Sequence, residues 1–314
     1  MRTATQKGYA LSLLAALAWA GTAPGLAYLL KTYAVPSLTL ALWRDIFATA
    51  ACLLGLTLLR PALLRVRRED LGWLALTGVI SIGVYHALWL WSVLLNGAAV
   101  AVVLIYLYPA FVTIGGKLLF GERVGRAHSA GIALAVIGCA LVVRVYDPAV
   151  FRLNWLGAAI GVLTAITHSV YVLSSQRAVS SYSPWTTLTY TMLFGSLTLA
   201  VMALLIAPTQ LLAIGTTPTP WLIAAGLAIG PTLGGYALFT MALKHIPGRT
   251  AGLIAVIEAP IGTLIAVVLL GERLEWQQVA GIALILGAIA LPQLGSLARR
   301  RRGADIIDAA AQRA

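Results

Sequence analysis

One stretch of sequence occurs twice and decides how the chain is built. Residues 97–123 read GAAVAVVLIYLYPAFVTIGGKLLFGER, and residues 248–273 read GRTAGLIAVIEAPIGTLIAVVLLGER. Each copy begins with glycine, continues as an apolar helix with a proline near its middle, and ends in Gly-Glu-Arg. Beyond this charged end, the residues AGIAL return at 130–134 and 280–284, an offset of 150. A repeat of this length in so apolar a chain indicates a duplicated membrane unit rather than a soluble repeat array.

The composition excludes an ordinary soluble protein. The 314 residues are 60% hydrophobic and 10% charged, with a mean hydropathy of +0.92, whereas soluble domains carry about 25% charged residues. The net charge of +12 would suggest nucleic acid as the partner of a soluble protein. In a membrane protein it favours orientation and contact with anionic lipid, so we predict no nucleic-acid partner. Cys52 and Cys139 both lie in apolar runs, and we expect no disulfide framework.

Ten apolar segments are each long enough to cross about 30 Å of hydrocarbon at about 1.5 Å per residue. Turn residues, mainly proline and glycine, separate them. We predict spans at residues 8–30, 36–59, 71–95, 97–120, 128–146, 153–174, 184–207, 221–243, 249–270 and 277–297.

The segments from Pro109 to Glu122 and from Pro260 to Glu272 resemble the EamA repeat of the drug/metabolite transporter (DMT) superfamily. The resemblance extends over roughly residues 8–297. It implies an all-α integral membrane protein with ten transmembrane helices, arranged as two inverted five-helix repeats. We therefore expect a first repeat at residues 1–146, a second, inverted repeat at 147–298 and a basic cytoplasmic tail at 299–314.

The distribution of Lys and Arg predicts the orientation of the chain. With the N-terminus in the cytoplasm, 17 Lys and Arg side chains fall on the cytoplasmic side and four on the outside, while Arg44 lies within a span. We therefore expect both termini in the cytoplasm and a multi-pass protein of the cell inner (plasma) membrane. We reject a cleaved signal peptide, because residues 8–19 align with 157–168 and their removal would break the duplication.

The sequence has none of the motifs that carry catalysis or nucleotide binding. It contains no Walker loop, nucleophile elbow, HExxH or CxxC. The four histidines, at 86, 128, 168 and 245, show no metal-ligand spacing. We therefore predict that the protein is not an enzyme and holds no cofactor or metal. A solute site is expected near the membrane midplane, where the two halves meet.

Five ionisable residues fall within spans, where charge is costly and therefore marks a candidate site. They are Arg44, Asp45, His86, His168 and Glu258. Glu258 could bind a substrate ammonium, couple transport to protons, or serve as a structural hydrogen-bonding group between helices. Arg44 could bind a substrate carboxylate, form a buried ion pair, or extend outwards to the interface. Asp45 points about 100° away from Arg44 on a helix, so we do not expect it simply to neutralise Arg44.

Aromatic side chains accompany these charges inside the predicted spans and suggest a cavity that encloses an organic solute. The alternative is that these rings belong to the interfacial belts of Trp and Tyr. The Tyr85-His86 pair followed by Tyr106 is similar to the pattern of YddG-like amino-acid exporters in the DMT superfamily, which favours amino acids over drugs. The predicted substrate-binding residues are Trp19, Arg44, Tyr85, His86, Trp89, Tyr106, His168 and Glu258.

These observations predict a membrane transporter that exports small organic metabolites or facilitates their movement, with amino acids as the favoured class. The two halves would rock around a central cavity in an alternating-access cycle. A multidrug exporter or a lipid flippase of the same fold is the alternative. The expected partners are a small-molecule substrate, the lipid bilayer and, for an antiporter, protons. Uniport, exchange and proton antiport stay open, as does the choice between monomer and homo-oligomer.

Overall fold

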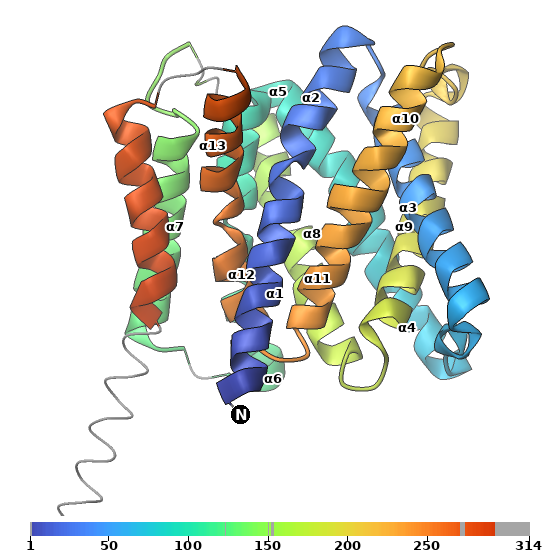
Figure 1. Ribbon diagram of the computed structural model, residues 1–314, viewed down its shortest axis with the longest axis horizontal. Coiled ribbons are helices and arrows are strands. Elements are labelled where there is room, and N and C mark those ends of the chain that lie inside the picture. Colours follow the sequence, from blue (N-terminus) through green and yellow to red (C-terminus); the bar gives the residue numbers. More distant parts are fainter. Residues whose placement is uncertain (1, 123, 150, 152–153, 271–273, 293–314) are drawn as a thin grey trace, which may run out of the picture.

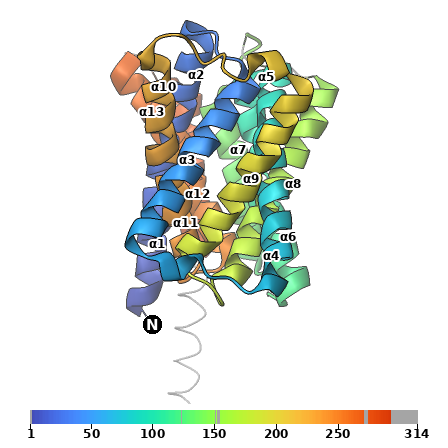
Figure 2. The ribbon, with the colours of Figure 1, turned by 90° about the vertical axis from the view of Figure 1, so that its right-hand side faces the viewer.

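The computed structural model describes residues 2–122, 124–149, 151, 154–270 and 274–292, and the regular elements in these ranges are helices. They stand side by side along a common direction, so that most connections lie at the two ends of the molecule (Figures 1 and 2). The second Gly-Glu-Arg at 271–273, the last residues of the expected final span and the expected tail at 299–314 lie outside the described residues.

The elements follow one another along the chain with short connections. The first part holds α1 (Arg2–Ala20), α2 (Thr22–Thr32), α3 (Ser37–Leu59), α4 (Arg68–Gly78), α5 (Tyr85–Ile105), α6 (Tyr108–Phe120) and α7 (Arg126–Val142). The second part holds α8 (Trp155–Ala178), α9 (Pro184–Ile206), α10 (Pro218–Leu227), α11 (Gly235–Ala242), α12 (Gly248–Ala255), α13 (Glu258–Leu270) and the helix Trp276–Pro292. Two π-helical segments, η2 (Val79–Val84) and η4 (Ala228–Gly234), join α4 to α5 and α10 to α11, and the 3₁₀ turns η1 (Pro61–Leu64) and η3 (Pro208–Gln210) follow α3 and α9.

Local sequence signals set several helix ends. The Asn154 side chain accepts a hydrogen bond from Gly157 N at 3.0 Å and so caps the start of α8. Ser183 precedes Pro184, the first residue of α9, where the missing N–H of proline has no helical partner to lose. Gly121 ends α6 in the left-handed region, with φ of 64°, a conformation that glycine adopts without strain.

Seven helices in the described part of the chain are long and apolar enough to cross a membrane. They are Ser37–Leu59, Arg68–Gly97, Ala99–Phe120, Trp155–Ala178, Pro184–Ile206, Pro218–Ala242 and Gly248–Ile265. Arg126–Val142 and Trp276–Pro292 are shorter apolar helices. The protein is therefore a multi-pass membrane protein, and its many exposed leucines, such as Leu59 and Leu205, are what lipid contact requires.

The repeated AGIAL residues pack α7 against the helix Trp276–Pro292. A Cβ atom on Gly131 would lie 2.8 Å from Ala288 O, and one on Gly281 would lie 2.6 Å from Gly138 O. Both distances are too short for a real Cβ, so glycine is what lets the two backbones come this close. Each repeated glycine therefore makes the same kind of contact with the helix that carries the other copy (Figure 1).

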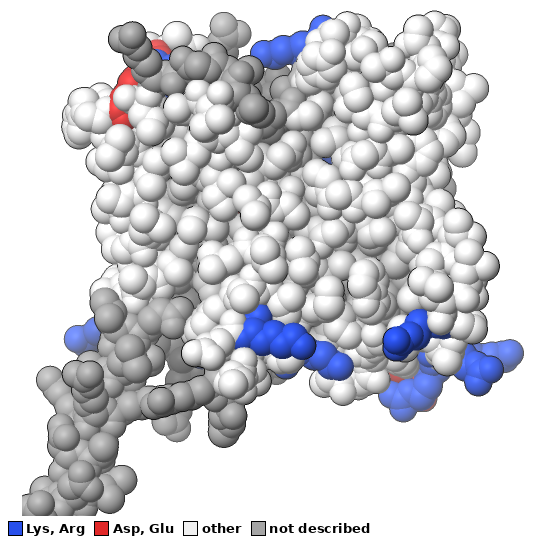
Figure 3. Space-filling model, in the orientation of Figure 1, with Lys and Arg blue, Asp and Glu red and all other residues white. Residues whose placement is uncertain are grey.

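Basic side chains gather at one end of the bundle. On the face drawn in Figure 3, Lys and Arg cluster at the end where α1 begins, and few lie at the opposite end. The band between the two ends is almost free of charge on this face. This separation is the pattern that a membrane-spanning protein needs, with charged side chains in water and apolar ones in lipid.

Candidate functional site

Prolines interrupt the helices in the middle of the molecule. A proline ring clashes with the carbonyl group four residues earlier and removes one helical N–H donor. The helices α1, α5 and α10 end at that carbonyl residue, and α12 ends one residue before it. The prolines concerned are Pro24, Pro109, Pro231 and Pro260. Irregular backbone within a membrane is tolerated where protein surrounds it or where it lines a cavity.

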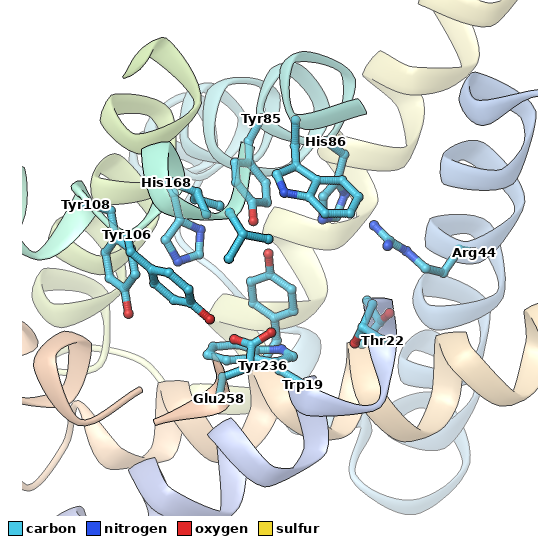
Figure 4. A pocket seen from close by; sticks show the side chains of 14 residues that line it. Trp19, Thr22, Arg44, Tyr85, His86, Tyr106, Tyr108, His168, Tyr236 and Glu258 are labelled. Carbon is cyan, nitrogen blue, oxygen red and sulfur yellow. The ribbon is translucent and has the colours of Figure 1, made fainter. Parts of the chain in front are cut away.

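The interruptions surround a cavity of about 120 Å³ (Figure 4). A dry cavity of ~150 Å³ in a protein core holds benzene, so this one has the scale of a small organic solute. All of the residues that the sequence predicts for the site line it, and their roles in binding stay predictions. They are Trp19 beside the α1–α2 break, Arg44 on α3, Tyr85, His86 and Trp89 on α5, Tyr106 in the α5–α6 break, His168 on α8 and Glu258 at the start of α13.

Six further lining residues were absent from that prediction: Thr22, Val102, Ile105, Tyr108, Thr232 and Tyr236. The sequence did contain an indication for Tyr236, because this residue matches Tyr85, a predicted cavity residue, at an offset of 151. Tyr108 aligns with Glu258 at the offset of 150 that the Gly-Glu-Arg ends share, and with Ala259 at the offset of 151 between Pro109 and Pro260. The structure favours the first alignment, since α6 begins at Tyr108 and α13 at Glu258. Nothing in the sequence distinguished Thr22 and Thr232.

Packed rings form one wall of the cavity. The centroid of the His168 ring lies 4.8 Å from that of Tyr85 and 4.6 Å from that of Tyr108, and the contact with Tyr108 is edge to face. The Trp19 and Tyr236 rings meet edge to face at 5.3 Å. Such contacts fix the orientation of large side chains, and all of these rings line the cavity.

Gly235 explains how the Trp19 indole fits against α11. A Cβ atom on Gly235 would lie 2.4 Å from Trp19 Nε1, a distance at which something must shift. Glycine at this position therefore lets the indole pack closely against the helix while it lines the cavity.

Glu258 marks one end of the cavity. It is half-buried and begins α13, so its carboxylate lies at a helix N-terminus, where negative charge is favourably placed. Figure 4 shows the Tyr106 hydroxyl directed towards this carboxylate. The neighbouring Tyr108 hydroxyl donates to Gly252 O at 2.9 Å, which ties α6 to α12 beside the cavity.

Arg44 marks the other end, and it is not alone there. Its Nε lies 3.4 Å from Asp45 Oδ1, and His86 Nδ1 lies 2.6 Å from Asp45 Oδ2. Asp45 therefore pairs with Arg44, and the expectation that it would not simply neutralise this charge is wrong. The helical angle between the two Cβ atoms is as expected, but the long arginine side chain folds back far enough to reach the neighbouring carboxylate.

Two buried polar atoms at the cavity have no hydrogen-bond partner in the part of the chain that the structure describes. They are Thr22 Oγ1 and His168 Nδ1. Buried polar groups are nearly always satisfied, so these two call for water or a solute. No group of three or more His, Cys, Asp or Glu side chains that could hold a metal occurs among the described residues.

The family profile of the EamA-like transporters matches the chain twice, over residues 6–144 and 155–292. The chain belongs to the EamA-like transporter family. The two matches together cover most of the chain and include every residue predicted for the cavity.

Relatives with curated names are transporters and exporters. A probable terminal-alkyne amino-acid exporter of Streptantibioticus cattleyicolor is 27% identical over 92% of this chain and 94% of its own length. An uncharacterized transporter of Archaeoglobus fulgidus is 28% identical over 62% of this chain and 66% of its own length. The threonine/homoserine exporter RhtA of Escherichia coli K12 is 29% identical, with just over half of each chain aligned, 56% in both cases.

A solved crystal structure has the same fold. Its chain is 22% identical to this one and superposes with a TM-score of 0.78, covering 96% of this chain and 99% of the other. At this level of identity the likeness extends to the fold and no further.

Proposed function

We propose that this protein exports small amino acids and amino-acid-like metabolites, or facilitates their movement, by alternating access. The observation that carries the proposal is that an acidic and a basic side chain line one aromatic cavity. The Glu258 carboxylate and the Arg44 guanidinium both line it, at different ends (Figure 4). A zwitterionic amino acid has an ammonium and a carboxylate, so it can contact both charges at once. We assign Glu258 to the ammonium and Arg44 to the carboxylate.

The size and walls of the cavity support a small substrate. Its volume of about 120 Å³ leaves little room for a lipid or a large drug. The ring faces of Tyr85 and His168 would take an apolar side chain. A hydroxyl on the substrate would find the unpaired atoms of Thr22 and His168. The names of two relatives, an amino-acid exporter and a threonine/homoserine exporter, point to the same class of substrate.

For the architecture, we propose ten spans in two inverted repeats, at residues 1–146 and 147–298. The seven long apolar helices, the two shorter ones and the broken pair α1–α2 supply this number. The two family matches, at 6–144 and 155–292, support the division. So do the equal lengths of α3 and α9, 23 residues each, and the breaks before α6 and α13, which begin at residues 108 and 258.

We further propose that the protein lies in the inner (plasma) membrane with both termini in the cytoplasm. The gathering of Lys and Arg at the end where α1 begins supports this orientation (Figure 3). That end would then be the side from which an exporter takes its substrate.

The test is flux in proteoliposomes with labelled L-threonine, L-homoserine, L-propargylglycine, L-phenylalanine, L-lysine and L-glutamate, each with and without an imposed pH gradient. Wild type is compared with Glu258→Gln and Arg44→Gln. The control is Glu69→Gln, a carboxylate with a 70% exposed side chain far from the cavity. We expect saturable flux of small neutral amino acids that both cavity variants reduce and the control leaves unchanged.

The gradient separates the modes of transport. Flux that needs the pH gradient and Glu258 identifies a proton antiporter, whereas flux indifferent to the gradient identifies a facilitator or exchanger. If folded wild-type protein moves no member of the panel, the amino-acid assignment is wrong, and lipid and drug substrates are tested next.

A further inference from the structure

Asp45 does not line the cavity, yet it touches two residues that do. It lies on α3 and is 0% exposed, inside a predicted membrane span. One carboxylate oxygen is 3.4 Å from Arg44 Nε, and the other is 2.6 Å from His86 Nδ1. The contact with His86 joins α3 to α5. Both carboxylate oxygens therefore contact side chains that line the cavity, although Asp45 itself does not.

The donor and acceptor roles in this cluster follow from elementary chemistry. The guanidinium of Arg44 is always protonated and can only donate. Beside this fixed positive charge Asp45 is an anion, and an anion can only accept. His86 must therefore donate through Nδ1–H. In the neutral ring the other nitrogen, Nε2, is then an acceptor, and this ring lines the cavity.

The contact between Asp45 and Arg44 Nε also orients the Arg44 side chain. Asp45 faces Nε, and Figure 4 shows the guanidinium of Arg44 directed into the cavity, which Thr22 also lines. The Thr22 hydroxyl has no hydrogen-bond partner among the described residues. An isolated guanidinium at this depth would be costly to bury. Because Asp45 balances its charge, Arg44 can stay in place while the cavity is empty.

We propose that Asp45 is the positioning residue of a carboxylate subsite formed by Arg44 and Thr22, and that it holds the neighbouring His86 in its Nδ1–H form. This inference rests on the proposed function for the identity of the ligand. The subsite would select solutes that carry a carboxylate over amines that lack one. Asp45 itself contacts no substrate and acts through Arg44 and His86.

An amide at position 45 cannot replace the carboxylate. In Asp45→Asn, one oxygen can still accept, but the other becomes an NH₂ donor. If the amide oxygen faces Arg44, the NH₂ faces His86, which must then accept through Nδ1 and carry its proton on Nε2. If the oxygen faces His86, the NH₂ opposes the Arg44 donor and Arg44 is released. The variant must therefore either move the His86 proton to Nε2 or release Arg44.

The first experiment observes the tautomer without any substrate. Protein labelled with ¹⁵N-histidine is placed in lipid nanodiscs, and its imidazole nitrogens are recorded by NMR, with His86→Gln to assign the His86 signals. We expect wild-type His86 to carry its proton on Nδ1. A proton on Nε2 in wild type overturns the proposal, and this measurement needs no variant of Asp45 to fold.

The second experiment measures selectivity. L-threonine and 1-aminopropan-2-ol, the same molecule without its carboxylate, compete against labelled L-threonine in proteoliposomes. We expect wild type to prefer the amino acid by about 10-fold or more. Asp45→Asn should either abolish most of this preference or show the Nε2–H tautomer. If the variant folds and changes neither property, the proposal fails.

The matched control is Thr49→Ala. Thr49 is another buried polar residue on α3, hydrogen-bonded to Ser196 at 2.7 Å, and it does not line the cavity. It should change neither the tautomer nor the selectivity, and an equal effect of both variants would reduce Asp45 to a general structural role. If wild type transports no amino acid, the proposed function fails, while the tautomer experiment still decides whether Asp45 holds His86.

Discussion

Glu122 ties the two parts of the chain together at the end where α1 begins, so removing its charge should loosen that end. Its Oε2 lies 3.0 Å from Arg249 Nη1, and Gln176 Nε2 donates to its Oε1 at 3.0 Å. Gln176 Oε1 in turn accepts from Gly248 N at 2.6 Å, so the network holds the first turn of α12. Under alternating access this end must open, and the network must then break.

The structure sets the size of the effect. The side chains of Glu122 and Arg249 are 14% and 22% exposed, so water screens the pair only in part. A hydrogen bond to a charged group stabilises by about 1.5–3 kcal/mol and a neutral one by about 0.5–1.5 kcal/mol. Glu122→Gln keeps the shape and one neutral hydrogen bond, so we expect a loss of about 1–2 kcal/mol. Opening of the first turn of α12 should become about 5- to 30-fold more frequent.

Hydrogen exchange of the amides at the start of α12, measured by mass spectrometry in nanodiscs, tests this directly. The control is Glu69→Gln at the same end of the molecule. Glu69 pairs with Arg67 at 3.1 Å, but both side chains are largely exposed, and such pairs contribute little. High salt should bring wild type closer to the Glu122 variant. Exchange in α12 that is equal in both variants would refute the network as a closure of this end.

Two further predictions concern packing and the cysteines. Gly195→Ala should destabilise the protein by about 1–3 kcal/mol, because the new Cβ would lie 2.4 Å from Ile82 Cγ2. Gly230→Ala, with nothing within 4 Å, should be tolerated, and thermal unfolding in detergent compares the two variants. Cys52 and Cys139 are buried and unpaired, so a membrane-impermeant maleimide should label neither in folded protein, whereas labelling should follow denaturation. Rapid labelling of the native protein would contradict the packing described here.

The sequence located most of the cavity because burial of charge in a membrane is so restrictive. Arg44, His86, His168 and Glu258 stood out as ionisable groups in apolar spans, and the structure brings all of them to one cavity. The aromatic residues of the cavity were predicted because they lie away from the span ends, where the interfacial belts of Trp and Tyr are expected. This reasoning needs no distances between helices, because the membrane itself makes a polar side chain in a span uncommon.

The sequence could not predict contacts that depend on how helices are rotated and kinked. Asp45 was judged from the helical angle alone, which ignores the reach of an arginine side chain. Thr22 became part of the cavity only because the chain breaks at Gly21, between α1 and α2. The offsets of 150 and 151 left two alignments for Tyr108, with Glu258 or with Ala259, and the starts of α6 and α13 favour the first. To predict these features, one must know the path of the backbone and the side chains where the helices are interrupted.

The helices repeat in the two halves of the chain, but the charged residues of the cavity do not. This difference indicates that the residues that determine the fold are not the ones that determine specificity. The π-helical segments η2 and η4, the breaks before α6 and α13, the close glycine contacts and the paired lengths of α3 and α9 occur in both halves. The charges do not. Tyr108 begins α6 where Glu258 begins α13, and Thr191 occupies the position on α9 that Arg44 occupies on α3. For each charge, the other half has the corresponding helix without it, so helix packing alone does not require either charge. Each is costly in a membrane, and the substrate that we propose, which would bind both, gives a reason for their presence.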